Sequence, residues 1–509
     1  MTERIAIIDL GSNSARLIIM HTYVNGAYNL VYHQKETVRL SEGMGKNAML
    51  TLEAMKRAID TLKIFSHMCQ LFEVSEIIGV ATAAVRNADN GESFLQLIAA
   101  ETGITLKVIS GTDEAYLGFS GVINTLDITD CILFDLGGGS TELTLIKNRQ
   151  PVDAVSLPFG AVNLTERFGT QDEVSAKKLY DLSTHIMQEL NKVSWLKELN
   201  LPLAGVGGTA RNIAKMDQKR KNYPFNKVHN YRLGSLSFLN LWQALTAATV
   251  KQRAKFAGLS KERSDIIIAG TTIVKNLFDI TNASRLIISG CGVREGLFFQ
   301  HYLTRMNQPL IIDNILEHST QNMLLFYKAN VSHANHLAYL TEAMFTGWQE
   351  LHDLDPRDQE LLRVASLLHD IGITINFYDH TRHGAYLVEN ARLFGLSHRE
   401  QMLAAVIVAW HNGPSAKYIR NKFYSEFLDE SDWQKARKLA LLLALAETLD
   451  TTQMGLVKKL RATSGDGQAH LSLTVDPRTA SIELAEVQQH RKWFKKEFGL
   501  DLILTVDPL

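Results

Sequence analysis

Residues 135–142 combine two carboxylates with three consecutive glycines, a composition suited to binding a phosphorylated ligand. The segment Asp-Leu-Gly-Gly-Gly-Ser-Thr-Glu lies between two short apolar runs, which predicts a strand, a tight turn and a second strand. Glycine lets the backbone approach an anion closely and direct N–H groups at phosphate oxygens. Asp135 and Glu142 would supply the hard oxygen ligands that Mg²⁺ prefers. A plain β-hairpin with two solvated carboxylates would explain this segment equally well.

A related segment occurs near the start of the chain. The motif Asp-Leu-Gly-x-x-Ser begins at Asp9 and again at Asp135, and strand-like apolar runs flank both copies. A motif that is repeated together with its strand pattern is stronger evidence than either copy alone. We therefore predict two related α/β halves that face each other across a cleft, each contributing one phosphate-binding hairpin.

The residues between the two hairpins predict the elements that position two further candidates. The pattern of apolar residues predicts helices at 52–71 and 91–102 and strands at 76–82 and 106–110. The first strand leads to Arg86, and the second leads to Glu114 in the first turn of a helix, with Gly111 and Thr112 forming the turn and cap. Arg86 could instead be a surface residue at the end of a strand. Glu114 could be a surface residue as well, because acidic side chains are common in a first helical turn.

Two later segments, 203–211 and 286–296, have the pattern of a strand, a glycine turn and a helix. A helix N-terminus that follows glycines is a favourable anion site, so Gly207, Gly208 and Thr209 are candidates for phosphate contact. Both segments could also be ordinary connections between a strand and a helix.

The segment 211–263 is strongly basic in a chain whose charges otherwise balance. It contains twelve Lys or Arg and two Asp or Glu, whereas the whole chain has 53 and 54, respectively. This clustering favours a polyanionic partner, and a solvated helical surface is the alternative. Aromatic residues are sparse here, so we expect no stacking on single-stranded nucleic acid.

Several of these segments resemble the motifs of one family, the exopolyphosphatase/guanosine pentaphosphate phosphohydrolase family of the actin-like ATPase superfamily. In the family's order and approximate spacing, the matching segments are Asp9-Leu-Gly-Ser-Asn-Ser14, Ala81-Thr-Ala-Ala-Val-Arg86, Ser110-Gly-Thr-Asp-Glu114-Ala115, Asp135 to Glu142, Gly207-Gly-Thr209 and Gly290-Cys-Gly-Val-Arg-Glu-Gly296. The resemblance covers essentially the full length.

The resemblance implies an α/β fold with duplicated ribonuclease-H-like (actin-like) halves, followed by an all-α HD-like domain and a small C-terminal α+β domain. The corresponding ranges are 1–125, 126–305, 310–455 and 465–509. In the last range we expect a ββαβ order after a Gly/Ser linker at 464–467. Strands are expected at 469–475, 480–487 and 500–506, with a helix that ends at 498 between the second and third strands.

The resemblance also implies the roles of individual residues. Glu114 would be the catalytic carboxylate that deprotonates the attacking water, assisted by Arg86 at the terminal phosphate. Asp135 and Glu142 would hold Mg²⁺, or Mn²⁺ in its place. The phosphate-binding residues would be Asn13, Ser14, Gly137, Gly138, Ser140, Gly207, Gly208 and Thr209. Phosphoryl transfer to water needs these parts: a positioned nucleophile, neutralising charge and backbone donors.

These residues predict an exopolyphosphatase that releases terminal orthophosphate from linear inorganic polyphosphate. The alternative substrate is guanosine pentaphosphate, (p)ppGpp, and the basic segment would line a channel for the remaining phosphates of either. Rival interpretations are a phosphotransferase of the sugar-kinase kind and an alarmone-binding protein without turnover. The family resemblance implies a homodimer, and we expect neither a membrane nor a specific nucleic acid as a partner.

The helical region carries a second group of candidate ligands. Eight of the 17 histidines lie between His333 and His411. His333, His369, Asp370 and Asp450 resemble the metal-binding pattern of the HD phosphohydrolase superfamily, with His380, His383 and His411 as possible further ligands for Mn²⁺, Fe²⁺ or Zn²⁺. Such a site could be the principal enzyme, or the cluster could be a buried polar network without metal. We expect His336, His352 and His398 at the surface.

The composition predicts a soluble, cytoplasmic protein. The chain is 46% hydrophobic, and its three cysteines are widely spaced in apolar surroundings, as expected of buried thiols in a reducing compartment. The N-terminus leads directly into a strand, so we expect no signal peptide. The longest apolar run, Leu439–Ala446, is too short to span a bilayer.

Overall fold

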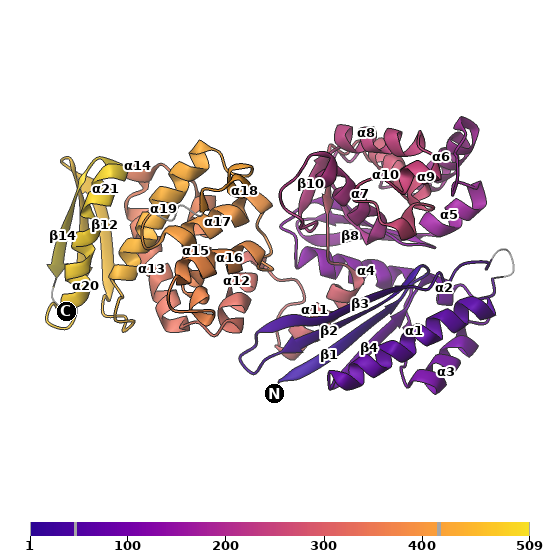
Figure 1. Cartoon of the computed structure of the whole chain (residues 1–509), viewed down its shortest axis with the longest axis horizontal. Helices are drawn as coiled ribbons and strands as arrows, with labels where there is room; N and C mark the ends of the chain where they lie inside the picture. Colours follow the sequence, from indigo (N-terminus) through magenta and orange to yellow (C-terminus); the bar gives the residue numbers. More distant parts are fainter. Residues whose placement is uncertain (1, 45–47, 415–418, 508–509) are drawn as a thin grey trace. The chain divides into compact units, whose positions relative to one another are not determined.

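The computed structural model describes residues 2–44, 48–414 and 419–507. The chain forms two compact units, and the boundary between them lies at Asp313 and Asn314, with the 25–27 turn grouped with the second unit. The first unit contains two sheets with helices packed against them (Figure 1). The second contains a group of helices and a three-stranded sheet.

Two sheets form the framework of the first unit. The first has the order β3-β2-β1-β4-β5, and the second has the order β10-β11-β9-β6-β7-β8. The strands of the first sheet are β1 (Glu3–Leu10), β2 (Ser14–Thr22), β3 (Tyr28–Thr37), β4 (Glu76–Ala81) and β5 (Lys107–Val108). Those of the second are β6 (Cys131–Leu136), β7 (Thr141–Lys147), β8 (Gln150–Leu157), β9 (Leu203–Val206), β10 (Tyr231–Gly234) and β11 (Arg285–Ile288).

The two sheets share one topology, which confirms the predicted duplication. In each, three consecutive strands pair antiparallel, and the next strand pairs parallel with the first of them. The turns between the first two strands are closed by the same hydrogen bond, from Gly11 N to Ser14 O at 3.1 Å and from Gly137 N to Ser140 O at 3.1 Å. Both copies of the sequence motif therefore occupy equivalent hairpins.

Helices follow the strands as the sequence predicts. The helices of the first unit are α1 (Leu52–Leu71), α2 (Ala83–Arg86), α3 (Gly91–Thr102), α4 (Gly111–Ile123), α5 (Ala161–Phe168), α6 (Ala176–Leu190), α7 (Gly207–Arg220), α8 (Ser235–Thr246), α9 (Val250–Arg253), α10 (Ile267–Thr281) and α11 (Val293–Arg305). The predicted ranges of α1 and α3 are confirmed. The cap of α4 differs from the prediction, because Ser110 rather than Thr112 accepts the hydrogen bond from Asp113 N, at 3.0 Å.

Apolar side chains fill the space between each sheet and its helices. One core joins the first sheet to α1 and α3, and a larger one joins the second sheet to α6, α7, α8 and α10. Cys69, Cys131 and Cys291 are buried free thiols, as predicted. Burial raises the pKa of Cys131 to about 12, so this thiol stays protonated and unreactive.

The second unit begins with helices, which confirms the predicted all-α region. They are α12 (Ile315–Phe326), α13 (Val331–Gly347), α14 (Gln349–His352), α15 (Pro356–Leu368), α16 (His380–Asn390), α17 (His398–Trp410), α18 (Lys422–Ser425) and α19 (Glu430–Thr448). The prediction that three histidines lie at the surface is wrong. His352 and His398 are buried, and His336 is half-buried. Polar partners make this burial possible: His352 Nε2, for example, lies 2.8 Å from the carbonyl oxygen of Phe345.

The C-terminal sheet differs from the prediction in two strands, because its first strand, at 459–465, was not predicted and one predicted strand is a helix. It consists of β12 (Lys459–Gly465), β13 (Gln468–Thr474) and β14 (Asp501–Asp507), with α20 (Ser481–Glu486) and α21 (Arg491–Phe498) before β14. The strand predicted at 480–487 is wrong, because α20 occupies this range. Its apolar residues alternate, but the buried positions are Ala480, Glu483 and Val487, three and four residues apart as in a helix, and Ile482 is exposed. Of the predicted linker at 464–467, residues 464 and 465 end β12, and only 466 and 467 form the turn to β13.

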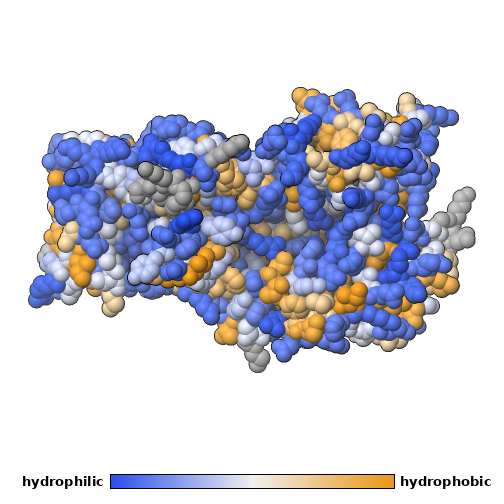
Figure 2. Space-filling model, in the orientation of Figure 1, coloured by the Kyte–Doolittle hydropathy of each residue, from blue (hydrophilic) through white to orange (hydrophobic). Residues whose placement is uncertain are grey.

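Among the described residues, no helix combines the length and the apolar character needed to cross a bilayer. On the face shown in Figure 2, hydrophilic side chains cover most of each unit, and hydrophobic ones occur in small separate patches.

A buried carboxylate stabilises the second half of the first unit. Asp217 on α7 is fully buried and accepts hydrogen bonds from Arg220, Lys221, Tyr231 and Ser237 at 2.8–3.0 Å. Burial alone would raise the pKa of Asp217, but the hydrogen bonds outweigh it and the pKa is lowered. The stability that this network provides is therefore present above the unfolded-state pKa and is lost as pH falls through the folded-state pKa.

We expect Asp217→Ala to lower the free energy of unfolding of the first unit by roughly 1–3 kcal/mol, because the buried hydroxyl of Tyr231 loses its partner. The side chains of Arg220 and Lys221 are 40% and 45% exposed, so water replaces most of what they lose. Chemical denaturation followed by circular dichroism measures this change. Asp181→Ala, at an exposed position on α6, is the matched control and should change stability by less than about 0.5 kcal/mol. An equal effect of both variants would contradict the structural role of Asp217.

Candidate active site

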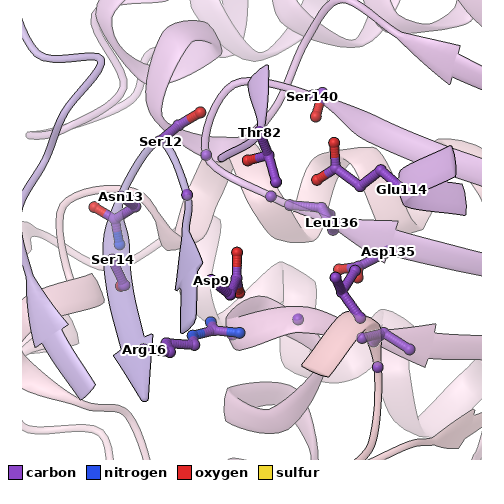
Figure 3. Close-up of a pocket in the computed structure, with 18 of the residues that line it drawn as sticks. Asp9, Ser12, Asn13, Ser14, Arg16, Thr82, Glu114, Asp135, Leu136 and Ser140 are labelled. Atoms are coloured by element: carbon purple, nitrogen blue, oxygen red, sulfur yellow. The ribbon is translucent and has the colours of Figure 1, made fainter. Parts of the chain in front are cut away.

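The two equivalent hairpins meet at a narrow cavity. The turn of one contacts the turn of the other, because a Cβ on Gly138 would lie only 3.2 Å from Asn13 Cβ. The cavity encloses about 80 Å³, and its lining residues come from both sheets and from the starts of α4, α7 and α11. Figure 3 shows several of these side chains pointing into one space from opposite walls. The polar lining residues are Asp9, Ser12, Asn13, Ser14, Arg16, Thr82, Glu114, Asp135, Ser140, Arg211, Arg263, Arg294 and Glu295.

Asp9 and Arg16 form the wall contributed by the first hairpin (Figure 3). They are directly paired across β1 and β2, so their backbone positions are fixed by the sheet. Asp9 is 9% exposed. Burial raises the pKa of its carboxyl group, and the positive charges of Arg16 and Arg294 oppose this shift. A buried, charged wall of this kind is stable only with a partner of complementary charge.

Asp135 ends β6 on the opposite wall, surrounded by glycines that leave room around its carboxylate. Gly207 has a φ of +99°, and a Cβ there would lie 2.5 Å from Leu136 O and 3.3 Å from Asp135 Oδ1. A Cβ on Gly292 would lie 3.7 Å from Asp135 Oδ2. Burial raises the pKa of Asp135 to about 6, with a further contribution from the negative charge of Asp9. Glycine at these positions thus keeps space open beside the carboxylate.

Glu114 and Arg86 lie together at the same end of the cavity. Arg86 Nη1 donates to Glu114 Oε2 at 3.0 Å and to the carbonyl oxygen of Ile109 at 2.8 Å. Burial, and then repulsion from Glu142, raises the pKa of Glu114 well above its usual value, although Arg86 opposes this. A carboxylate with a raised pKa is a stronger base than a solvated one, as a water-activating group requires. Glu114 lines the cavity, whereas Arg86 supports it from behind.

Glu142 lies behind the cavity lining rather than within it. It is 3% exposed, and Ser156 Oγ donates to its Oε1 at 2.9 Å. Burial, and then the charge of Asp135, raises the pKa of Glu142 to about 7. The predicted pair of metal ligands is therefore brought close together, and Asp9 adds a further carboxylate that faces the cavity directly.

The predicted phosphate-binding residues divide into two groups. Asn13, Ser14, Gly137, Gly138, Ser140, Gly207 and Gly208 line the cavity. Thr209 does not, because it is fully buried on α7. Within the described residues, Ser14 Oγ is buried and has no hydrogen-bond partner, as expected of a group that binds a ligand.

The backbone of the glycine turn is oriented for anion binding. The first N–H groups of α5 donate to the carbonyls of Gly137 and Gly138, from Ala161 at 3.0 Å and from Val162 at 2.9 Å. Because the C=O and N–H of a trans peptide point in opposite directions, the N–H groups of Gly138 and Gly139 point away from α5. Gly138 lines the cavity, so its N–H group is available to an anion there.

Four arginines line the cavity: Arg16, Arg211, Arg263 and Arg294. Arg211 and Arg263 are the two ends of the basic segment that was predicted to line a phosphate channel, whereas Arg16 and Arg294 were not predicted as site residues. Burial, and then repulsion from Arg16 and Arg294, lowers the pKa of Arg211 to about 9. Burial and Arg16 similarly lower the pKa of Arg263 to about 10. Nη1 of Arg294 is buried with no hydrogen-bond partner in the described part of the chain. Guanidinium groups held this close together indicate a site for a polyanion.

The repeat contains a signal for one of these arginines. Arg16 pairs with Asp9 at the position where Glu142 pairs with Asp135 in the other hairpin. The remaining three lie far apart in sequence on α7, near 263 and on α11, so only the tertiary fold brings them together.

The basic segment 211–263 serves more than one purpose. Arg211 and Arg263 line the cavity. Arg220 and Lys221 instead form ion pairs with Asp217. Arg253 is fully buried and donates to backbone carbonyls, among them that of Asp172 at 2.5 Å. Most of the positive charge at the reaction site therefore comes from a few buried arginines rather than from a continuous basic surface.

The carboxylates are suited to a hard divalent cation. The carboxylates of Asp9, Asp135, Glu142 and Glu114 are buried near one another, and burial raises the pKa of each. A bound cation would offset the mutual repulsion, and oxygen ligands of this kind match Mg²⁺. The donor set thus fits the predicted metal.

Comparison with known proteins assigns the chain to a family. The model of the Ppx/GppA phosphatase family matches residues 19–305, and the model of Ppx/GppA phosphatase domain III matches residues 315–489. The chain belongs to the Ppx/GppA phosphatase family. The predicted resemblance is confirmed, and at the level of the family so is the prediction of a hydrolase that acts on phosphate bonds.

Solved structures of Ppx/GppA proteins confirm the predicted duplicated α/β fold. A family member from Aquifex aeolicus is 28% identical with a TM-score of 0.52, and it covers 60% of this chain and 99% of its own. An exopolyphosphatase from Cytophaga hutchinsonii is 25% identical with a TM-score of 0.56 and the same coverage.

A curated relative shares only part of its length with this Ppx/GppA chain. It is a bifunctional 3-dehydroquinate synthase/phosphatase from Fusobacterium nucleatum, 34% identical over 303 residues. The match covers 56% of this chain and 44% of that protein.

Proposed function

We propose that the protein is an exopolyphosphatase that hydrolyses the terminal orthophosphate from linear inorganic polyphosphate. The observation that carries this proposal is the convergence of Arg16, Arg211, Arg263 and Arg294 on the cavity that also holds Glu114 and Asp135. Four buried guanidinium groups exceed what a single phosphoryl group needs, and they suit consecutive phosphates of a chain. The volume of about 80 Å³ is far below the roughly 300–1,000 Å³ of pockets that enclose a drug-sized ligand, which favours binding of a chain end.

In the proposed mechanism, Glu114 accepts a proton from the water that attacks the terminal phosphorus. Arg86 keeps the Glu114 carboxylate oriented through the ion pair at 3.0 Å. Asp135 and Glu142, with Asp9, would hold Mg²⁺, which neutralises charge on the phosphate oxygens. The backbone N–H groups of the glycine turn bind the equatorial oxygens.

The arginines would bind the departing polyphosphate. As the P–O bond breaks, negative charge develops on the bridging oxygen of the shortened chain. Guanidinium groups close to that oxygen stabilise this charge, and they are fixed by burial before the reaction begins.

The proposal is tested by measuring orthophosphate release from polyphosphate and from guanosine pentaphosphate side by side, with Mg²⁺ and without an acceptor. We expect the higher kcat/KM with polyphosphate. A preference for guanosine pentaphosphate would reassign the substrate. Turnover only in the presence of an acceptor would indicate a phosphotransferase, and tight binding without release would indicate a sensor.

Gly208→Ala tests the role of Arg263 without removing it. A Cβ on Gly208 would lie 2.0 Å from Arg263 Cζ, so the guanidinium must move. Loss of one charge-assisted phosphate contact should lower kcat/KM by about 10–100-fold, equivalent to roughly 1.5–3 kcal/mol.

Steady-state phosphate release measures this effect, and Gly234→Ala is the control, because a Cβ there meets no atom closer than 4.0 Å. If Gly208→Ala acts through Arg263, it should have little further effect in an Arg263→Ala background. Fully additive losses would show that Gly208 acts in another way.

A further inference from the structure

The helices α12 to α19 of the second unit, together called the helical unit, contain a cluster of imidazoles and carboxylates that lies outside the phosphatase cavity. Its members lie on or beside α13, α15, α16, α17 and α19, which form one group of helices in Figure 1. The donor atoms form two groups, each with all atoms within 4.8 Å of one another: His333, His369, Asp370 and Glu447, and Asp370, His380 and His411.

All four histidines are held in the same way. The Nδ1 atoms of His369, His380 and His411 lie 2.9, 3.1 and 2.7 Å from the carbonyl oxygens of Ser366, Phe377 and Val408. His333 Nδ1 lies 2.7 Å from Asp450 Oδ2. Because these oxygens can only accept, each Nδ1 carries the hydrogen, and the Nε2 lone pair faces the cluster. Histidine ligands of metals are usually oriented by such contacts.

The second group contains two facing lone pairs. His380 Nε2 and His411 Nε2 are 3.2 Å apart. Since both rings donate through Nδ1, neither neutral ring can donate to the other through Nε2. Either an extra proton or a cation bound by both nitrogens must therefore stabilise this arrangement.

The donor atoms of the first group are spaced like the ligands of one metal ion. Glu447 Oε2 lies 3.3 Å from His333 Nε2 and 3.0 Å from His369 Nε2. All three atoms are buried, and none has a hydrogen-bond partner among the described residues. Ligands bound to one ion at about 2.0–2.2 Å are roughly 3 Å apart, which matches these distances.

Asp370 connects the two groups. Its Oδ2 lies 3.4 Å from His369 Nε2, and its Oδ1 lies 3.5 Å from His380 Nε2. One carboxylate that directs its two oxygens at different donor groups has the geometry of a bridge between two ions.

One side of the cluster faces solvent. The side chains of His333 and His369 are 1% exposed, whereas those of Glu447, His380 and Asp370 are 25%, 18% and 14% exposed. A metal held here would keep a coordination position for water or for an oxygen of a ligand, unlike a closed structural site.

We propose that the helical unit binds two divalent transition-metal ions, one held by His333, His369, Asp370 and Glu447 and the other by Asp370, His380 and His411. Imidazole and carboxylate together suit Mn²⁺, Fe²⁺ or Zn²⁺. Asp450, predicted as a ligand, instead orients His333. Glu447 takes its place, three residues earlier in the last turn of α19.

The test is metal stoichiometry of the full-length protein. After removal of metal with a chelator and reloading with Mn²⁺ or Zn²⁺, elemental analysis should find two tightly bound ions per chain. His411→Ala should retain one. Asp450→Asn should keep the stoichiometry but lower affinity by about 10–100-fold, as expected for a residue that orients a ligand. His67→Gln, at an exposed histidine on α1, is the control and should change neither value.

A second measurement needs no variant. Co²⁺ bound to the wild-type protein should give d–d absorption bands, and anomalous scattering should place two ions at the cluster. Metal bound only at millimolar concentration, or absent from the cluster, would overturn the proposal in favour of a protonated imidazole network.

The outcome is independent of the phosphatase proposal. Asp135→Asn should leave the two transition-metal ions bound. His369→Ala should lose the ion that His369 helps to bind, yet retain Mg²⁺-dependent phosphate release. If His369→Ala abolishes phosphate release while circular dichroism shows a folded protein, the helical cluster is the principal enzyme and the cavity assignment fails.

Discussion

Replacing Glu114 with glutamine is expected to lower kcat for phosphate release by about 10²–10⁴-fold, the usual contribution of a general base. The amide keeps the shape of the side chain but cannot accept the proton of the attacking water. Substrate affinity should be nearly unchanged, because Glu114 contributes little to ground-state binding. Single-turnover phosphate release combined with equilibrium binding of polyphosphate separates these two effects.

Glu92→Gln is the matched control for Glu114→Gln. Glu92 is an exposed acid in the first turn of α3, as Glu114 is an acid in the first turn of α4. If the role of Glu114 were only to interact with the helix dipole, the two variants would have similarly small effects, within about 1 kcal/mol in stability. Retained turnover in Glu114→Gln would remove this residue from the mechanism.

Asp135→Asn should strongly reduce Mg²⁺-dependent turnover. Asp135 is buried between glycines that leave space beside its carboxylate, so an amide there would weaken metal binding directly. We expect kcat/KM to fall by at least about 10³-fold at low Mg²⁺, with partial recovery as the Mg²⁺ concentration is raised.

The Mg²⁺ dependence of phosphate release measures the effect of Asp135→Asn, and Asp127→Asn, at an exposed position, is the control. An unchanged Mg²⁺ dependence in Asp135→Asn would show that the metal is held elsewhere. A loss of activity that no Mg²⁺ concentration restores, together with a normal fold, would place Asp135 in direct contact with the substrate.

The sequence alone was sufficient for the duplicated fold, because the repeated motif and the alternation of strands and helices are local signals. It was also sufficient to place Glu114 at a helix start, since turn and capping residues precede it. It was insufficient for Arg294, and it could not show which residues of the basic segment reach the cavity, because the packing of distant elements decides this.

Errors arose where one pattern is compatible with two structures. Alternating apolar residues at 480–487 predict a strand, but burial of Glu483 and Val487 selects a helix. In the helical unit, Glu447 and Asp450 both approach His333, at Nε2 and Nδ1 respectively, and spacing alone could not show which nitrogen each carboxylate meets. Only the orientation of the imidazoles decides this.

In the first hairpin Asp9 pairs with Arg16, whereas in the second Asp135 pairs with Glu142. This difference between the two hairpins has a consequence for substrate orientation. Two identical hairpins would form a site with approximate two-fold symmetry, and a linear polyphosphate, whose two ends are alike, could bind such a site in either direction. Exchange of one carboxylate for a guanidinium removes this symmetry. The side of the cavity at which a terminal phosphate reacts is then defined by the divergence between the two copies rather than by the fold that they share.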